Sequence, residues 1–524
     1  MPLRLALIGC MLLILAAGVT GCGRSWPREF LIVSGSENTV LEPIVKDYCK
    51  TRGVDCKFTY KGSLDIGFAL RDGTVPFDAV WPASSVWIDI FDTGRKAKHV
   101  QSVAQMPVIL GVRMAKAKEL GWIGNPVTMA GILAAVTSGK LHYIMTSATQ
   151  SNSGASAYLA MLSTSLGDAQ TLEGKDLDNP SLRQKVQALL KGVERSAGSS
   201  GWLADLYVER AKANQPFDAM WNYEAVLKET NDSLVKAGKE QLYAVYPSDG
   251  VAVADSPLGY IDRTGNGETE KFFLDLQAHL LAKDAQQKIA ATGRRVSLSG
   301  IKGAPEPAWN FDTARRIAVI RAPAREVIER ALSVYQEALR RPSLTGICLD
   351  FSGSMGQNGG EQQLQAAMRE LLTPAIAAAE FIQWTPSDHI VVVPFREHNE
   401  AVYEGEGNPG DQAKLLAAVQ SHHAEGGTDM YTCTVEVLRR LLTKSAAGDF
   451  LPAIIIMTDG RTEGSATSFE SAWRAAGGNI PVFGVTFGDA DLTQLEALAK
   501  LTGGRVFDGK KDLSSAFRAT RGYN

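Results

Sequence analysis

Two stretches decide the fold of the second half of the chain: Thr345-Gly-Ile-Cys-Leu-Asp-Phe-Ser-Gly-Ser354 and, further along, Ala453-Ile-Ile-Ile-Met-Thr-Asp-Gly460. Each is a short apolar run that ends in an aspartate surrounded by hydroxyl-bearing residues and glycine. Such runs are typical of buried parallel strands followed by loops. Because the carboxyl ends of parallel strands meet at one edge of a sheet, we expect the two aspartates to lie at a common site.

The same alternation extends to the C-terminus. Apolar strands are expected at 345–349, 390–394, 453–457 and 481–486, and amphipathic helices at 361–372, 411–420, 429–443, 468–476 and 491–501. This order predicts a doubly wound, Rossmann-like α/β domain over residues 343–524.

Five oxygen-bearing side chains of this domain are candidate metal ligands: Asp350, Ser352, Ser354, Thr428 and Asp459. They include no His or Cys, so the set suits Mg²⁺, Mn²⁺ or Ca²⁺ rather than zinc or copper. The three hydroxyls can bind the ion directly, and the two carboxylates can hold its water ligands. A carboxylate from another protein could then complete the site.

The complete Asp-x-Ser-x-Ser pattern, with the later Thr and Asp, resembles the metal-ion-dependent adhesion site of von Willebrand factor A domains. The resemblance implies a sheet ringed by helices and Mg²⁺-dependent binding of a protein partner through an acidic residue. A metal with only a structural role, or an unused site, remains an alternative. Nearby, Gly405–Gly410 matches a dinucleotide-binding pattern but contains Glu406 and Pro409, and His422-His423 has no partner ligands; we expect loops at both.

The first half of the chain also alternates strands with helices, which predicts an α/β fold with mostly parallel sheets. Several loops after strands are rich in serine and glycine, and helices are expected to begin just beyond them. Helix N-termini with hydroxyls can bind an anion without formal positive charge, although helix capping alone would explain most of these serines. The candidate ligand-binding residues are Ser34, Ser36, Ser63, Ser84, Ser153 and Tyr223.

Residues 30–300 resemble the two-lobed bacterial extracellular solute-binding proteins. The resemblance is carried by Ser34-Gly-Ser-Glu-Asn38, Tyr60-Lys-Gly-Ser-Leu-Asp65, Phe77-Asp-Ala-Val-Trp81, Thr149–Ser156, Tyr223-Glu224, Tyr246–Gly250 and Ala285–Arg295. It implies that two lobes close on a small solute, with the first lobe built from both ends of the module, and that an oxyanion is one candidate. No arginine stands in the serine-rich loops, and Asp65, Asp249 and Glu224 would oppose an anion if they face the cleft.

The N-terminus reads as an export signal over residues 1–21, with one basic residue and a nearly pure aliphatic run. Val19-Thr-Gly-Cys22 resembles a bacterial lipobox, so Cys22 would carry acyl chains such as palmitate and begin the mature chain, followed by an anchor linker over 22–29. An ordinary signal peptide with a free cysteine is the alternative. We expect a membrane-anchored protein that faces the periplasm or the cell exterior.

Cys49 and Cys56 flank the end of a helix, where a disulfide and two free thiols are both reasonable. Cys348 in an apolar strand and Cys433 at a helix start are expected to be buried free thiols. Between the two modules, the proline-containing stretch 301–342 is expected to be a linker with a docking helix at 324–340.

The 524 residues carry 54 Lys and Arg against 57 Asp and Glu, which argues against nucleic-acid binding. No phosphate-binding loop or nucleophile elbow occurs, so we expect no enzyme. Three hypotheses follow: an anchored protein that binds a solute and, through Mg²⁺, a protein; the substrate receptor of an ABC-type importer; or an adhesion or scaffold protein without a solute.

Overall fold

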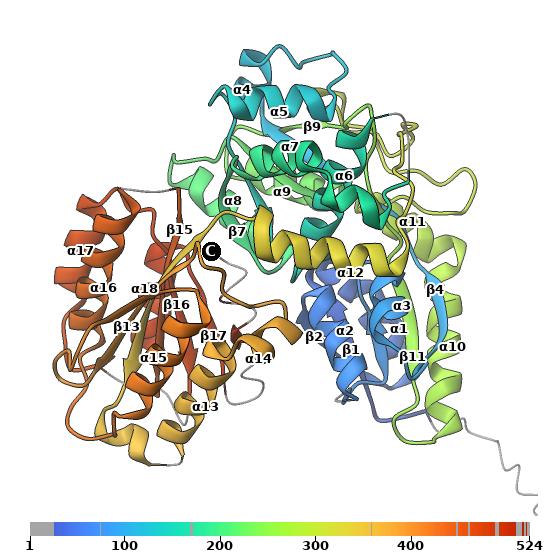
Figure 1. Ribbon diagram of the computed structural model, residues 1–524. Helices are drawn as coiled ribbons and strands as arrows, with labels where there is room; N and C mark the ends of the chain where they lie inside the picture. The colour runs from blue at the N-terminus through green and yellow to red at the C-terminus, as the bar shows by residue number, and fades with distance from the viewer. Residues whose placement is uncertain are drawn as a thin grey trace, which may run out of the picture.

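The chain folds into two α/β lobes and a third α/β body, joined by a long connecting segment (Figure 1). The computed structural model describes residues 26–73, 75–167, 171–357, 359–446, 449–459, 462–487, 492–509, 516–517 and 520. The expected export signal and Cys22 lie outside these residues. No helix in the part described is both long enough and apolar enough to cross a membrane.

Lobe 1 is a five-stranded sheet that uses both ends of the N-terminal half, as expected from the resemblance. Its strands are, in spatial order, β2 (Asp55–Lys61), β1 (Glu29–Gly35), β3 (Ala79–Trp81), β11 (Pro257–Ile261) and β4 (Ala97–Ser102). Its helices are α1 (Glu42–Arg52), α2 (Ser63–Asp72), α3 (Ser85–Phe91), α10 (Gly267–Leu281) and α11 (Lys283–Ala291). Phe30 and Ile32 of β1 pack against Phe272 and Leu276 of α10 in the core.

Lobe 2 is built from the middle of the same half. Its sheet has the order β10 (Val253–Ala254), β5 (Met106–Arg113), β8 (Ala219–Tyr223), β6 (Tyr143–Thr146) and β7 (Val193–Ala197), and β9 (Leu242–Val245) also pairs with β5. Its helices are α4 (Met114–Glu119), α5 (Met129–Thr137), α6 (Asn152–Leu166), α7 (Pro180–Leu190), α8 (Ser200–Lys212) and α9 (Glu224–Lys236).

The expectation of mostly parallel sheets is wrong for both lobes, which have mixed sheets. In lobe 1, β11 runs antiparallel to β3 and to β4. In lobe 2, β8, β9 and β10 all run antiparallel to β5. The cause is the chain path: β11 returns from lobe 2 into lobe 1, and a returning strand has no helical crossover to impose the parallel direction.

The C-terminal domain, by which we mean residues 343–520, has a six-stranded sheet. Its order is β14 (Tyr403–Glu406), β13 (His389–Phe395), β12 (Ser343–Asp350), β15 (Leu451–Thr458), β16 (Val482–Thr486) and β17 (Val506–Asp508). All neighbours are parallel except β13 and β14. Its helices are α13 (Gly360–Leu372), α14 (Pro374–Ala379), α15 (Pro409–Gln420), α16 (Met430–Ser445), α17 (Ala466–Ala475) and α18 (Thr493–Thr502).

The central strand β12 is buried along its whole length because helices cover both faces of this sheet. Ile347 and Leu349 pack on one face with Leu364 of α13. Leu344 and Cys348 pack on the other face with residues of α16. Gly346 permits this close approach, since a Cβ atom there would lie 2.0 Å from Cγ1 of Val437.

The segment between the halves carries α12 (Arg325–Val334), which continues into a single π-helical turn, Tyr335–Leu339. The helix lies across the two lobes (Figure 1) and bonds to each of them. Arg325 donates to the carbonyl oxygen of Asp89 in lobe 1 (3.1 Å), and Arg330 donates to Asp178 in lobe 2 (2.7 Å). The helix is therefore a brace between the lobes rather than a free tether.

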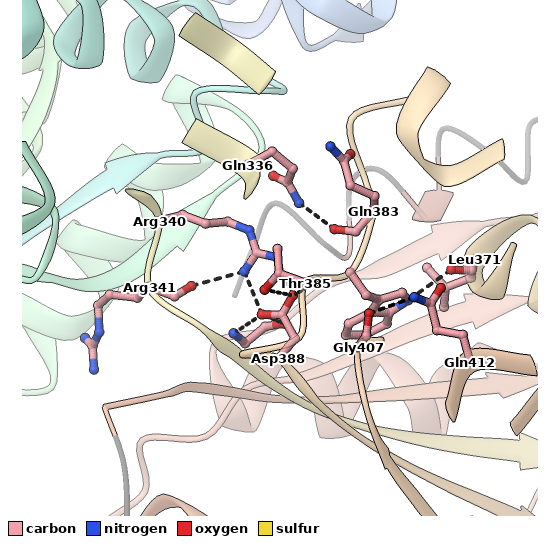
Figure 2. Close-up of polar contacts among 11 residues, drawn as sticks. Gln336, Arg340, Arg341, Leu371, Gln383, Thr385, Asp388, Gly407 and Gln412 are labelled. Atoms are coloured by element: carbon pink, nitrogen blue, oxygen red, sulfur yellow. Dashed lines mark hydrogen bonds and ion pairs between the residues drawn. The ribbon is translucent and has the colours of Figure 1, made fainter. Parts of the chain in front are cut away.

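Beyond the π-helical turn, one carboxylate fastens the connecting segment to the C-terminal domain (Figure 2). Asp388, which is fully buried, accepts two hydrogen bonds from the guanidinium of Arg340. It also accepts from the backbone N–H groups of Ser343 (2.6 Å) and Thr385 (2.8 Å) and from both hydroxyls. Gln336 adds a bond to the carbonyl oxygen of Gln383 (3.0 Å).

The C-terminal domain also contacts both lobes directly. Arg71 of lobe 1 forms an ion pair with Glu380 (2.7 Å), just after α14, which reaches toward α2 in Figure 1. In lobe 2, Arg195 donates to the carbonyl oxygens of Asn479 (3.2 Å) and Gly503 (2.8 Å). The three bodies thus form one connected unit.

Two disulfides are present. Cys49 and Cys56 are joined, one of the two arrangements that the sequence left open. Cys348 and Cys433 are also joined, so the expectation of free thiols at these positions was wrong. The two cysteines are 85 residues apart, and only the packing of α16 against β12 brings them together.

Removal of the second bridge should destabilise the chain more than removal of the first. A disulfide restricts the unfolded chain in proportion to the logarithm of the loop that it closes, and the loops here span 85 and 7 residues. We expect Cys348→Ser/Cys433→Ser to lower the free energy of unfolding by about 2 kcal/mol more than Cys49→Ser/Cys56→Ser. Urea unfolding of both double variants measures this; equal losses would contradict it.

Candidate metal and solute sites

The first candidate site lies where the winding of the C-terminal sheet reverses. After β12 the chain adds β13 on one side, and it later returns to add β15 on the other side. Such a switch point leaves a crevice at the carboxyl ends of the two neighbouring strands. Asp350 ends β12 and Asp459 directly follows β15, so both carboxylates lie at this crevice.

Hydrogen bonds connect four of the five expected metal ligands. Asp350 accepts from the backbone N–H of Ser352 (2.8 Å), and the Oγ atoms of Ser352 and Ser354 are 3.1 Å apart. Ser354 donates to Asp459 (2.9 Å), and Thr458 donates to Asp350 (2.5 Å) across the two strands. The site is graded in depth: Asp350 and Ser352 are buried, and Ser354 is exposed.

Thr428 belongs to the neighbouring loop. The carbonyl oxygen of Gly426 accepts from the backbone N–H of Gly353 (3.0 Å), so the two loops touch. The left-handed backbone of Gly426 (φ 76°) makes this turn, which L residues other than glycine rarely adopt. Thr428 is half-buried, and its carbonyl oxygen accepts from Glu463. In the described part of the chain, its hydroxyl forms no hydrogen bond with the other four residues.

The chemistry of this donor set fits a hard cation. Burial raises the pKa of Asp350 to about 6 and also raises the pKa of Asp459. Two carboxyls that accept from neighbouring hydroxyls at one crevice are what a divalent cation would stabilise in their charged form. Across the described ranges, no group of three or more His, Cys, Asp or Glu is placed to hold a metal.

The second candidate site lies between the lobes. Ser36 of lobe 1 accepts a hydrogen bond from the backbone N–H of Gly201 in lobe 2 (3.1 Å). It also lines a cavity of about 530 Å³ with Tyr60 and Asp65 of lobe 1 and with Trp202 of lobe 2. Phe507 and its neighbours in β17 supply a third wall, so the C-terminal domain contributes to this cavity.

The other sequence candidates hold the lobes together internally. Ser84 caps α3 by accepting from the N–H of Val86 (3.4 Å), and Ser63 accepts from the N–H of Ala83 (3.0 Å). Buried Ser34, Ser153 and Tyr223 bond to Trp81, Thr146 and Asn152 respectively. Of the acids, Glu224 is paired with Arg295, and Asp249 accepts from the N–H of Met129 at the start of α5.

Glu37, which sequence reasoning did not select, lies at the contact between the lobes. Its side chain is 4% exposed, and its Oε2 accepts from Ser200 of lobe 2 (3.4 Å), while no described residue forms a hydrogen bond with its Oε1. Burial raises the pKa of Glu37 to about 7. A lone acid within a serine-rich stretch gave no signal of this burial.

This carboxyl should make stability fall as pH rises. Between about pH 4.5 and 7 the folded chain holds a proton on Glu37 that the unfolded chain has lost, so stabilisation declines across that window. Glu37→Gln should therefore stabilise the protein at pH 8 by on the order of 3 kcal/mol and change little at pH 4. Thermal unfolding at the two pH values measures this, with exposed Glu209→Gln as the control; an equal gain at both pH values would contradict it.

Comparison with solved structures finds similar folds at low identity. A ferric binding protein from Campylobacter jejuni is 12% identical, with 58% of this chain and 98% of that chain covered and a TM-score of 0.43. The periplasmic binding protein AfuA from Actinobacillus pleuropneumoniae, with fructose-6-phosphate bound, is 16% identical, with 58% and 94% covered and a TM-score of 0.41. No conclusion about ligands rests on scores this low.

A von Willebrand factor type A protein from Catenulispora acidiphila is 20% identical, with a TM-score of 0.30. The match covers 36% of this chain and 43% of that one, so the chain spans less than half of that protein. No curated protein matches the chain.

Two protein families match large parts of the chain. Residues 346–516 match the von Willebrand factor type A domain. Residues 31–295, just over half of the chain, match the bacterial extracellular solute-binding proteins. Both are families of binding proteins. The chain therefore belongs to the bacterial extracellular solute-binding protein family and carries a von Willebrand factor type A domain behind its two-lobed module.

Proposed function

We propose that the protein is a membrane-anchored extracytoplasmic binding protein that takes a small solute between its lobes and a protein partner at a Mg²⁺ ion on its A domain. The observation that carries the second part is the bonded group of Asp350, Ser352, Ser354 and Asp459 at the switch point of the sheet. In this proposal, acyl chains on Cys22 hold the protein at the membrane.

The metal site would work through a division of roles. Ser352, Ser354 and Thr428 would hold the ion through neutral oxygens, and Asp350 and Asp459 would orient its water ligands. Because Ser354 is exposed, a partner can approach from its side of the crevice. The ion supplies a positive charge that an acidic side chain of the partner can bind, and the weakly donating hydroxyls leave most of that charge available.

Divalent metal binding tests this site directly. We expect the full chain to bind Mn²⁺, followed by electron paramagnetic resonance, and Ser354→Ala to weaken binding at least about tenfold because a direct oxygen ligand is lost. Ser354 is exposed, so the variant should fold normally. Partner capture from membranes should disappear with chelator and in the same variant.

Asp411→Asn is the matched control, since this residue lies in the first turn of α15, outside the metal loops, and its carboxylate accepts from the backbone N–H of Glu406 at the end of β14. Equal Mn²⁺ affinity in the wild type and Ser354→Ala would rule out the proposed ligand set.

The solute part of the proposal rests on the three-walled cavity. Its walls offer aromatic faces from Tyr60, Trp202 and Phe507 and cationic groups from Lys61 and Arg505. Aromatic walls with a few charged groups suit a small polar solute. Asp65, Asp205 and Asp508 also line the cavity, so carboxylates outnumber the two cations, which argues against a solute that is anionic on every side.

Calorimetry with sugars, sugar phosphates and inorganic oxyanions tests this part. We expect one of these solutes to give saturable heat, and Trp202→Ala and Phe507→Ala each to weaken its binding by about tenfold, because each removes a stacking face. Arg52→Gln on the surface of lobe 1 should leave the affinity unchanged. Equal solute affinity in the wild type and in Phe507→Ala would contradict the contribution of the A domain to the cavity.

The brace α12 supports a coupling between the two sites. The helix bonds to both lobes through Arg325 and Arg330, and the segment that follows it bonds to the A domain through Arg340. A change in the angle between the lobes therefore strains the same segment that positions the A domain.

A further inference from the structure

A second and larger groove separates lobe 2 from the A domain; its lining residues differ from those of the solute cavity, although α8 contributes to both. Its volume is about 990 Å³. Lobe 2 contributes Arg195 and Arg210, and the A domain contributes Arg474 and Lys500. Glu194 and Glu209 also line the groove, so four cationic side chains stand against two carboxylates.

Arg195 owes its position to an irregular strand. It lies in β7, the edge strand of the lobe 2 sheet, and the pairing register with β6 shifts between Val193 and Arg195. A bulge of this kind redirects the side chains next to it. Arg195 is 8% exposed even though it lines the groove.

The guanidinium of Arg195 lacks a counter-charge. Its two terminal nitrogens donate to the carbonyl oxygens of Asn479 and Gly503, and its Nε has no partner. Within the ranges that the structure covers, Arg195 forms no ion pair with a carboxylate. An arginine has five N–H donors, so most of the capacity of this one is unused.

Arg210 stands beside it, and Glu194 supplies part of its counter-charge. Its Nη2 donates to the side-chain oxygen of Asn479 (3.3 Å), and its Nε has no hydrogen-bond partner among the described residues. Burial, and to a smaller extent the charge of Arg210, lower the pKa of Arg195 to about 9, so this guanidinium remains charged at neutral pH. A buried, uncompensated guanidinium is unfavourable, and a bound anion is the simplest compensation.

We propose that this groove is a binding site for a small oxyanion, held by Arg195 and Arg210 of lobe 2, with Arg474 and Lys500 on the A-domain wall. Guanidinium groups bind phosphate-type and sulfate-type oxygens through paired, charge-assisted hydrogen bonds. Since both arginines already contact Asn479, a bound oxyanion would strengthen the seam between lobe 2 and the A domain. The site is independent of the metal loops and of the solute cavity.

Titration calorimetry of the full chain with inorganic phosphate at low ionic strength tests the site. We expect one saturable binding event in the wild type, and affinity reduced at least about tenfold in Arg195→Gln and in Arg210→Gln. Arg195→Lys should retain part of the affinity, since it keeps the charge and loses the paired geometry. Sulfate should compete with phosphate, and chloride at equal ionic strength should not.

Three controls make the result decisive. Arg52→Gln, on the surface of lobe 1, should bind phosphate as the wild type does. Arg210 is half-buried, so Arg210→Gln tests the site even if Arg195→Gln unfolds. Trp202→Ala alters the solute cavity alone, and phosphate binding should survive it.

The proposal would be overturned by no saturable phosphate binding by the wild type, or by binding that both arginine variants retain. Loss of phosphate binding in Trp202→Ala alone would also overturn it and would instead assign the anion to the solute cavity. That result would leave the proposed solute-binding function intact, so the two proposals can fail separately.

Discussion

The arrangement of the whole chain depends on the buried carboxylate of Asp388. It binds Arg340 at the end of the connecting segment and the backbone of both Ser343, where β12 begins, and Thr385, which precedes β13. A buried carboxylate is tolerated only when it is paired and hydrogen-bonded, and here Arg340 and two backbone N–H groups satisfy Asp388. One residue thus sets where the connecting segment ends and where the central sheet of the A domain starts.

From that joint, the two candidate sites follow from sheet geometry. β12 leads from the joint to Asp350, so the metal loops lie at the opposite end of the strand that Asp388 fixes. Parallel neighbours bring Asp459 to the same edge. In the solute-binding module, helices and loops at the lobe boundary form the cavity, and β17 reaches it because the A domain contacts both lobes.

The elements that carry the metal ligands were predictable from sequence because their signals are local. Apolar runs ending in Asp350 and near Asp459 identify strands, and the strand order of a doubly wound sheet brings their ends together. Whether the five residues bind a metal remains a prediction.

The features that sequence could not supply depend on contacts between distant segments. The bridge between Cys348 and Cys433 requires α16 to pack on β12, and nothing near either cysteine signals it. In the sequence, Arg195 resembles an ordinary surface arginine of a strand. In the structure, it lies at a register shift and is buried against the A domain. Glu37 is buried only because lobe 2 packs against it. Each of these features depends on contacts between elements that are distant in the sequence, whereas a local sequence pattern describes one element at a time.

The brace formed by α12 has a thermodynamic consequence. Because it bonds to both lobes and leads into the joint at Asp388, the angle between the lobes and the pose of the A domain are not independent variables. If ligands at both ends prefer one angle, each would alter the affinity of the other, and linkage would make that effect reciprocal and equal in magnitude. Ligand binding at one end of the molecule would then change the ligand affinity at the other end.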